Sequence, residues 1–151
     1  MISALLVVAL IGCGTAAGVM FAVAVSVVPA LRDLPVDRYI QAHQLLGRNW
    51  DPTMPIMVLG TCAAEAVLAT LAHSAAGTAL FGIASILMLA SSLVSHLLNV
   101  PLNRMVKKMR SDVPPPAGWR DPRPEWRKWH LLRTALIIAA FTATACAAAI
   151  H

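Results

Sequence analysis

Four long apolar stretches dominate this sequence and restrict what the chain can fold into. The first stretch, residues 1–31, carries no charged side chain. It is longer than the roughly 20 apolar residues that an α-helix needs to cross a bilayer. Backbone groups in lipid must bond within the protein, so these stretches are predicted to be membrane-spanning helices. We expect the four spans at about 3–31, 54–73, 78–100 and 129–150.

The composition also favours a membrane protein. Only 13% of the 151 residues are charged, against about 25% in soluble domains. We therefore expect a single integral membrane domain of the all-α class, a bundle of four transmembrane helices. The net charge of +5 would suggest nucleic acid as the partner of a soluble protein. The positions of the charges explain it better here, so we expect the lipid bilayer as a partner and no nucleic acid.

The basic residues are confined to two polar segments, 32–53 and 104–128. These segments carry 3 and 8 of the 12 Lys and Arg side chains, and Arg133 is the remaining one. The short turn between the second and third spans carries none. By the positive-inside rule, both segments are expected in the cytoplasm of a bacterial-type inner membrane. Both termini are then expected on the other side.

Segment 32–53 contains a helical pattern of its own. Apolar side chains recur at helical spacing at Val36, Tyr39, Ile40 and Leu46. Asp33 is a suitable N-cap, and Gly47 can end the helix. The pattern predicts an additional short amphipathic helix between the first and second spans, with His43 on its apolar face.

The third span carries a polar stripe. On a helix, five polar side chains fall within about 60° of one another: Ser85, Ser92, His96, Asn99 and Asn103. Pro101 also frees the carbonyl of Leu97 beside this stripe. Such groups need protein or water partners in lipid. The stripe therefore predicts the wall of an internal polar cavity.

Other elements are expected to direct polar side chains toward the cavity near the cytoplasmic face. The start of the fourth span has Trp126, His130 and Arg133 at i, i+4 and i+7. A buried arginine there could hold an enolate, phenolate or carboxylate, although an isolated arginine could also snorkel to the interface. His43, His96 and His130 fall at one depth and could ligate copper, iron or zinc. A metal-free pocket with a histidine acid or base, and simple interfacial anchoring, are the alternatives.

Glu65 is the single charged residue of the second span, about ten residues past Pro55 and so about 15 Å deep. A charge at that depth costs at least about 2.5–3.5 kcal/mol. We therefore expect Glu65 to be protonated or paired and to face the bundle interior. Two roles stay open: a hydrogen bond across the bundle, or a proton relay or partner for Arg133 or a histidine.

Two motifs carry a family resemblance. Asn99-Val-Pro-Leu-Asn103, followed by Trp126-x-x-Trp129-His130-x-x-Arg133-Thr134, resembles the anthrone-oxygenase-like family of small four-helix membrane proteins. The resemblance implies a membrane-embedded oxygenase without an obvious bound cofactor, acting on reduced polycyclic aromatics such as anthrones. On this analogy Asn99, Asn103, Trp129 and Arg133 would line the pocket. His130 stands where the family more often has Asn.

These observations together predict a membrane oxidoreductase of secondary metabolism acting on a small, hydrophobic, aromatic or polyketide-like substrate. We expect catalytic roles for His96, His130, Arg133 and Glu65. We expect substrate contacts from His43, Gln44, Asn49, Asn99, Asn103, Trp126 and Trp129. No bound cofactor is expected, and a copper or iron enzyme ligated by His43, His96 and His130 is the first alternative. A subunit for proton or small-solute transport is the second alternative. A homo-oligomer is also open, since four short helices enclose little volume.

Overall fold

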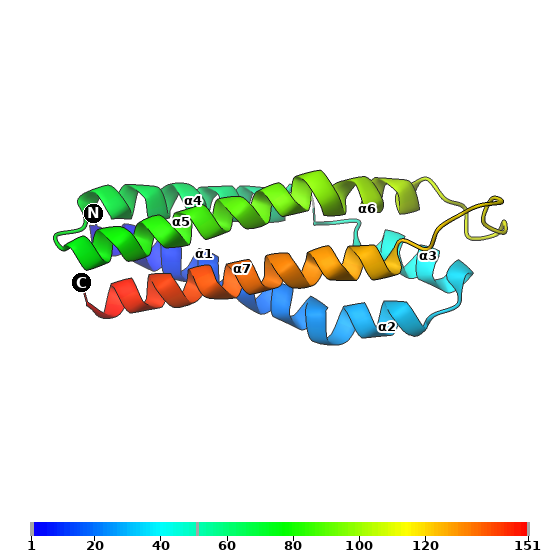
Figure 1. Ribbon diagram of the computed structural model, residues 1–151, viewed down its shortest axis with the longest axis horizontal. Coiled ribbons are helices and arrows are strands. Elements are labelled where there is room, and N and C mark those ends of the chain that lie inside the picture. Colours follow the sequence, from blue (N-terminus) through cyan, green and yellow to red (C-terminus); the bar gives the residue numbers. More distant parts are fainter. Residues whose placement is uncertain (1, 51, 151) are drawn as a thin grey trace.

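The computed structural model describes residues 2–50 and 52–150, and its regular elements are helices. Four helical rods lie side by side in an elongated bundle, with both termini at one end (Figure 1). All four rods are long and apolar enough to cross a membrane. The predicted all-α bundle is confirmed, and these four helices support an integral membrane protein.

The first rod consists of α1 (Ile2–Ala22), a π-helical turn η1 (Val23–Val27) and α2 (Val28–Asp33). Pro29 cannot donate a backbone hydrogen bond, and the wider π turn that ends two residues before it accommodates the missing bond. The N–H of Val28 bonds to the carbonyl of Val23 across this turn. The proline therefore does not end the helix, which continues to Asp33 rather than stopping near residue 31.

The third rod repeats this arrangement with α5 (Ala75–Val94), a π turn η2 (Ser95–Asn99) and α6 (Val100–Lys107). Pro101 stands two residues past the π turn, as Pro29 does in the first rod. The N–H of Val100 bonds to the carbonyl of Ser95. The helix extends to Lys107 instead of the expected residue 100, because its last turns are amphipathic and pack on α3.

The remaining elements are α3 (Val36–Leu46), α4 (Thr53–Leu71) and α7 (Arg123–Ala149). The expected short helix is present as α3, but Pro35 occupies its N-cap position, because Asp33 belongs to α2. Its buried side chains Tyr39 and Ile40 pack with Leu31 and Val106, so α3 folds back against the end of the bundle. The fourth rod starts at Arg123, earlier than the expected 129, since polar residues form its first turns.

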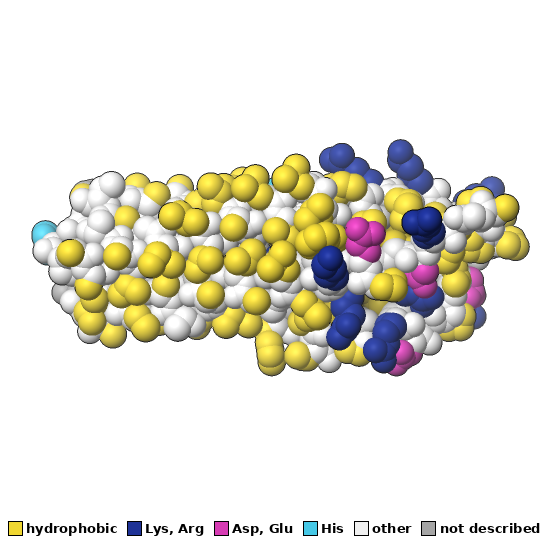
Figure 2. Space-filling model, viewed as in Figure 1, with side chains coloured by type: hydrophobic (Ala, Val, Ile, Leu, Met, Phe, Trp, Pro, Cys, Tyr) yellow, Lys and Arg dark blue, Asp and Glu magenta, His cyan; other side chains and the backbone are white. Residues whose placement is uncertain are grey.

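The middle of the bundle is an apolar core of small and medium side chains from all four rods, including Cys13, Val58, Met88, Ile137 and Ala140. The charged side chains instead gather at the end that holds α2, α3 and α6 (Figure 2). We call this the charged end. The two polar segments thus lie at the same end of the molecule, opposite the termini.

Candidate functional site

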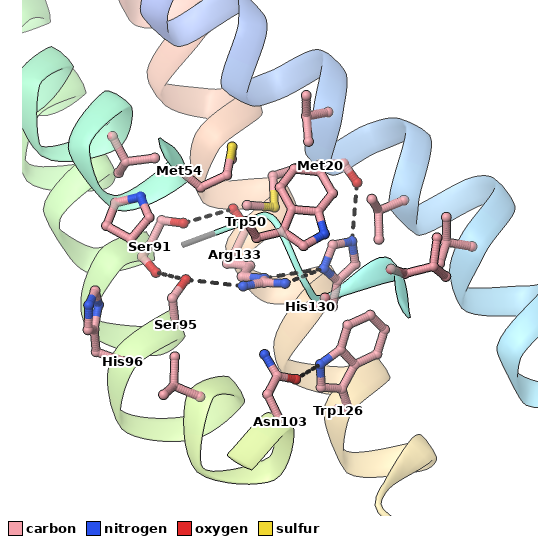
Figure 3. Close-up of a pocket in the computed structure, with 18 of the residues that line it drawn as sticks. Met20, Trp50, Met54, Ser91, Ser95, His96, Asn103, Trp126, His130 and Arg133 are labelled. Carbon is pink, nitrogen blue, oxygen red and sulfur yellow. Dashed lines mark hydrogen bonds between the residues drawn. The ribbon is translucent and has the colours of Figure 1, made fainter. Parts of the chain in front are cut away.

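A cavity of about 400 Å³ lies between the two π turns, toward the charged end (Figure 3). Its apolar wall comes from the first rod and α4: Val19, Met20, Val23, Val27, Leu31, Met54, Pro55 and Val58. Its polar wall comes from the third rod and α7: Ser91, Ser92, Ser95, His96, Asn103, Trp126, His130 and Arg133. The volume falls in the usual range for small-molecule sites. An aromatic ring with polar groups along one edge fits such a two-sided space.

Arg133 is the charged group on the polar wall. Its Nε and Nη2 lie 3.2 and 2.9 Å from Nδ1 of His130, and its Nη1 donates to Ser95 Oγ at 3.3 Å. Figure 3 shows the guanidinium held between these two side chains. Arg133 is partly buried, and no carboxylate pairs with it among the described residues. An unpaired guanidinium in a cavity favours an anionic ligand.

Both ring nitrogens of His130 form hydrogen bonds. Arg133 can only donate, so Nδ1 of His130 must accept. On the other side, Nε2 lies 3.2 Å from the carbonyl oxygen of Met20, which can only accept. The ring is therefore the neutral Nε2–H tautomer. In this arrangement His130 positions Arg133 and has no lone pair left for a substrate proton.

Trp126 stacks on His130 with ring centroids 5.2 Å apart and an interplanar angle of 9°. Its indole N–H donates to Asn103 Oδ1 at 2.8 Å, which fixes the orientation of that amide. The same oxygen accepts from Nε2 of His43 at 3.2 Å. Burial, together with the nearby Lys107 charge, lowers the pKa of His43, while the Asn103 bond opposes this shift. The second ring nitrogen of His43 has no hydrogen bond within the described part of the chain.

His96 lines the cavity and is exposed on its outer side. Its Nδ1 donates to the carbonyl of Ser92, at 3.0 Å. No residue of the described chain bonds to the other nitrogen, Nε2. In the neutral form of the ring this nitrogen has a lone pair, which can accept a proton. Among the histidines predicted for the site, His96 fits a general base better than His130.

The cavity lining is cationic. Besides Arg133 it includes Arg104 and Lys107. No Asp or Glu belongs to the lining among residues 2–50 and 52–150, while Asp51 lies outside the described residues.

Glu65 is not part of this site. It is fully buried in the bundle interior and accepts a hydrogen bond from Thr144, and Cys13 Sγ lies 3.4 Å from the same Oε1. Seven residues of α4, about 10 Å along the helix, separate it from Val58 at the cavity wall. Of the two open roles, the geometry provides the hydrogen bond across the bundle and does not provide the partnership with Arg133 or a histidine.

Four predicted substrate contacts lie outside the cavity lining. Gln44 donates to the backbone carbonyls of Val106 and Met109 and so ties α3 to the end of α6. Asn99 is buried and donates to the carbonyl of Trp126. Trp129 bonds to Glu125 and packs against Lys128, outside the cavity. Asn49 is exposed on the loop before α4. The structure thus gives these residues structural or surface positions.

The three histidines line one cavity without forming a metal-ligating group. Within the described residues, no group of three or more His, Cys, Asp or Glu side chains is placed to hold a metal ion. His130 is the physical reason, because both of its nitrogens are already bonded to Met20 and Arg133. The predicted set of His43, His96 and His130 does not fit a three-ligand copper or iron site in this arrangement.

Several lining residues were not predicted. Ser91 and Ser95 connect the third rod to α7 at the site: Ser91 Oγ donates to the carbonyl of Arg133, and Ser95 Oγ accepts from the Arg133 guanidinium. Trp50, on the loop before α4, covers the cavity from the side (Figure 3). The spacing of Ser91, Ser95 and the predicted Ser92 along one helix was the available signal for the two serines.

Comparison with known proteins gives one match. A model of the family described as anthrone oxygenase matches residues 43–143, which include most polar residues of the cavity. No curated protein and no solved structure gives a significant match.

Proposed function

The chain belongs to the anthrone oxygenase family, and on that premise we propose that it oxidises a reduced polycyclic aromatic ketone, such as an anthrone, inside the membrane. The substrate's methylene carbon becomes a carbonyl, so an anthrone becomes a quinone. One dioxygen is consumed and one water is formed. The observation that supports this most is the partly buried guanidinium of Arg133, which lines the cavity without a carboxylate partner in the described chain.

The first step is removal of a proton from the methylene group by Nε2 of His96. The electron pair moves onto the ketone oxygen and gives an enolate. Arg133 has five N–H donors, of which three bond to His130 and Ser95. The other two are available to the enolate oxygen, which carries more charge than the ketone did. This preferential stabilisation of the developing anion is what accelerates the step.

The enolate then donates one electron to dioxygen, and the resulting radical and superoxide combine to form a carbon–oxygen bond. The peroxide takes up the proton held by His96. Loss of the second methylene proton breaks the oxygen–oxygen bond and releases water, leaving the carbonyl. Because the enolate itself is the reductant, we propose that no bound cofactor is needed.

We further propose that the charged end lies in the cytoplasm, following the positive-inside rule. The substrate would then partition into the cavity from the inner leaflet. The third rod continues to Lys107, whereas α4 starts only at Thr53. Beside η2 and α6 the cavity is therefore flanked by the end of α3 and the loop carrying Trp50, and not by a membrane-spanning helix.

The transport alternative finds less support. A proton pathway would need polar groups between the cavity and Glu65. Between them lie the apolar core residues around Met88, Val58 and Ile137, and the buried Thr61, whose hydroxyl is already bonded to the carbonyl of Met57.

The test is an assay of the detergent-purified protein with anthrone, following quinone formation by absorbance. Wild-type protein is expected to form quinone well above the rate of spontaneous oxidation. The control is the double variant His96→Ala/Arg133→Gln, purified in the same way. Equal rates in the two preparations would contradict the proposal.

A further inference from the structure

Two cationic side chains stand at the outer end of the cavity, remote from Arg133. Arg104 and Lys107 lie one helical turn apart on α6, and both line the cavity. Neither forms an ion pair with any described residue. Gly47, which ends α3 and lies close to Lys107, and Trp50, on the loop before α4, line the same cavity. We call these four residues the cationic rim.

The two cations of the rim are attached to the third rod well away from the serine that binds Arg133. The Arg133 guanidinium bonds to Ser95, and Arg104 comes nine residues later on the same rod. Nine residues correspond to about 13 Å along a helix. An anion bound at the rim would therefore be a second group, at the opposite end of the molecule whose enolate Arg133 holds.

Resting on the proposed function, we infer that the substrate carries a carboxylate on the ring remote from the reacting carbon, and that Arg104 and Lys107 bind it. A guanidinium and an ammonium one turn apart match the two oxygens of a carboxylate. A single carboxylate also leaves the molecule apolar enough to enter from lipid, whereas a phosphate ester would carry about two charges.

The inference predicts charge-dependent selectivity. The assay uses two substrates, an anthrone carboxylic acid and its methyl ester, with kcat/KM measured for each on the purified protein. Wild-type protein is expected to favour the acid by about tenfold or more. Arg104→Gln and Lys107→Gln are each expected to reduce the acid-to-ester ratio by about tenfold, as for loss of one charge-assisted bond. Lys108→Gln is the matched control, because Lys108 is exposed like Arg104 and Lys107 but does not line the cavity.

Failure of the inference is distinguishable from failure of the proposed function. If both substrates are oxidised and the two rim variants leave the acid-to-ester ratio unchanged, the carboxylate site is wrong and the oxygenase stands. If neither substrate is oxidised, the oxygenase is wrong. In that case the affinities of the acid and the ester, measured by quenching of tryptophan fluorescence, test the carboxylate site alone. Equal affinities would overturn it. A preference for the acid in the wild type that disappears in Arg104→Gln would support it.

Discussion

Replacing Arg133 by glutamine removes the positive charge from the polar wall while keeping a side chain that can donate hydrogen bonds. In the wild-type protein two guanidinium N–H groups remain after those used by His130 and Ser95. Hydrogen bonds to charged groups contribute about 1.5–3 kcal/mol each. Because these bonds strengthen as the enolate forms, we expect kcat for anthrone oxidation to fall by about 10²–10³-fold.

The same change is expected to leave the fold intact. A partly buried cation without a counter-ion is a cost to the folded state, and Arg133 has no carboxylate partner in the described chain. The melting temperature of Arg133→Gln should therefore be equal to that of the wild type or higher. Arg127→Gln is the control, since Arg127 is an exposed residue of α7 that does not line this cavity.

Quinone formation under saturating anthrone, with thermal unfolding of the same preparations, is the assay. A variant that keeps kcat within about threefold of wild type would refute the role given to Arg133. A loss of activity accompanied by a large drop in melting temperature would instead mean that the guanidinium holds the helices together.

Four further predictions concern other parts of the molecule. His96→Ala should lower kcat by about 10²–10⁴-fold, with partial recovery at high pH where hydroxide replaces the base; a flat pH–rate profile at the wild-type level would contradict this. Glu65→Gln should retain both activity and melting temperature, because an amide can take the place of the buried carboxyl; loss of turnover would return Glu65 to the mechanism. Burial lowers the folded-state pKa of His43, so the stabilising contribution of the neutral His43 ring is complete above about pH 6.5 and is lost as the pH falls through the lower folded-state pKa. The melting temperature of His43→Gln should therefore change less than that of the wild type between pH 7 and pH 5. Gly12→Ala should destabilise by about 1–3 kcal/mol in denaturant titrations, because its Cβ would overlap the Thr61 hydroxyl, whereas Gly60→Ala, with open space around it, should not.

The sequence was most informative where hydrophobicity and helical spacing decide the outcome. The apolar stretches predicted the four rods, because spans must satisfy their own backbone in lipid. The i, i+4, i+7 spacing of Trp126, His130 and Arg133 placed them on one face, and all three line the cavity. His96 and Asn103 also reach it from the predicted polar stripe.

Other parts of the site depend on contacts that helical spacing does not encode. Glu65 faces the bundle interior, as expected. Its partner Thr144 could not be predicted, because it lies on another helix whose register the sequence does not specify. Gln44 and Asn99 looked like cavity residues, yet backbone carbonyls of neighbouring segments bind their amides. The sequence did not predict that Met20 and Met54 line the cavity. An apolar residue in a membrane span gives the same sequence pattern whether it faces lipid or a cavity.

The alternative of a histidine-ligated metal illustrates the same limit. A shared depth suggested that His43, His96 and His130 could meet at one ion. The hydrogen bonds of His130 to Met20 and Arg133 became visible only in the folded arrangement, and they turn a predicted ligand or base into a residue that positions the guanidinium.

The most direct test of the central claim is oxygen uptake by purified protein that has been dialysed against a metal chelator and then given anthrone. The account predicts uptake well above the protein-free rate, with one dioxygen consumed for each quinone formed. Uptake no faster than the protein-free rate would contradict the proposed oxygenase. Uptake that returns only when copper or iron is added would contradict a reaction in which the enolate reduces dioxygen unaided.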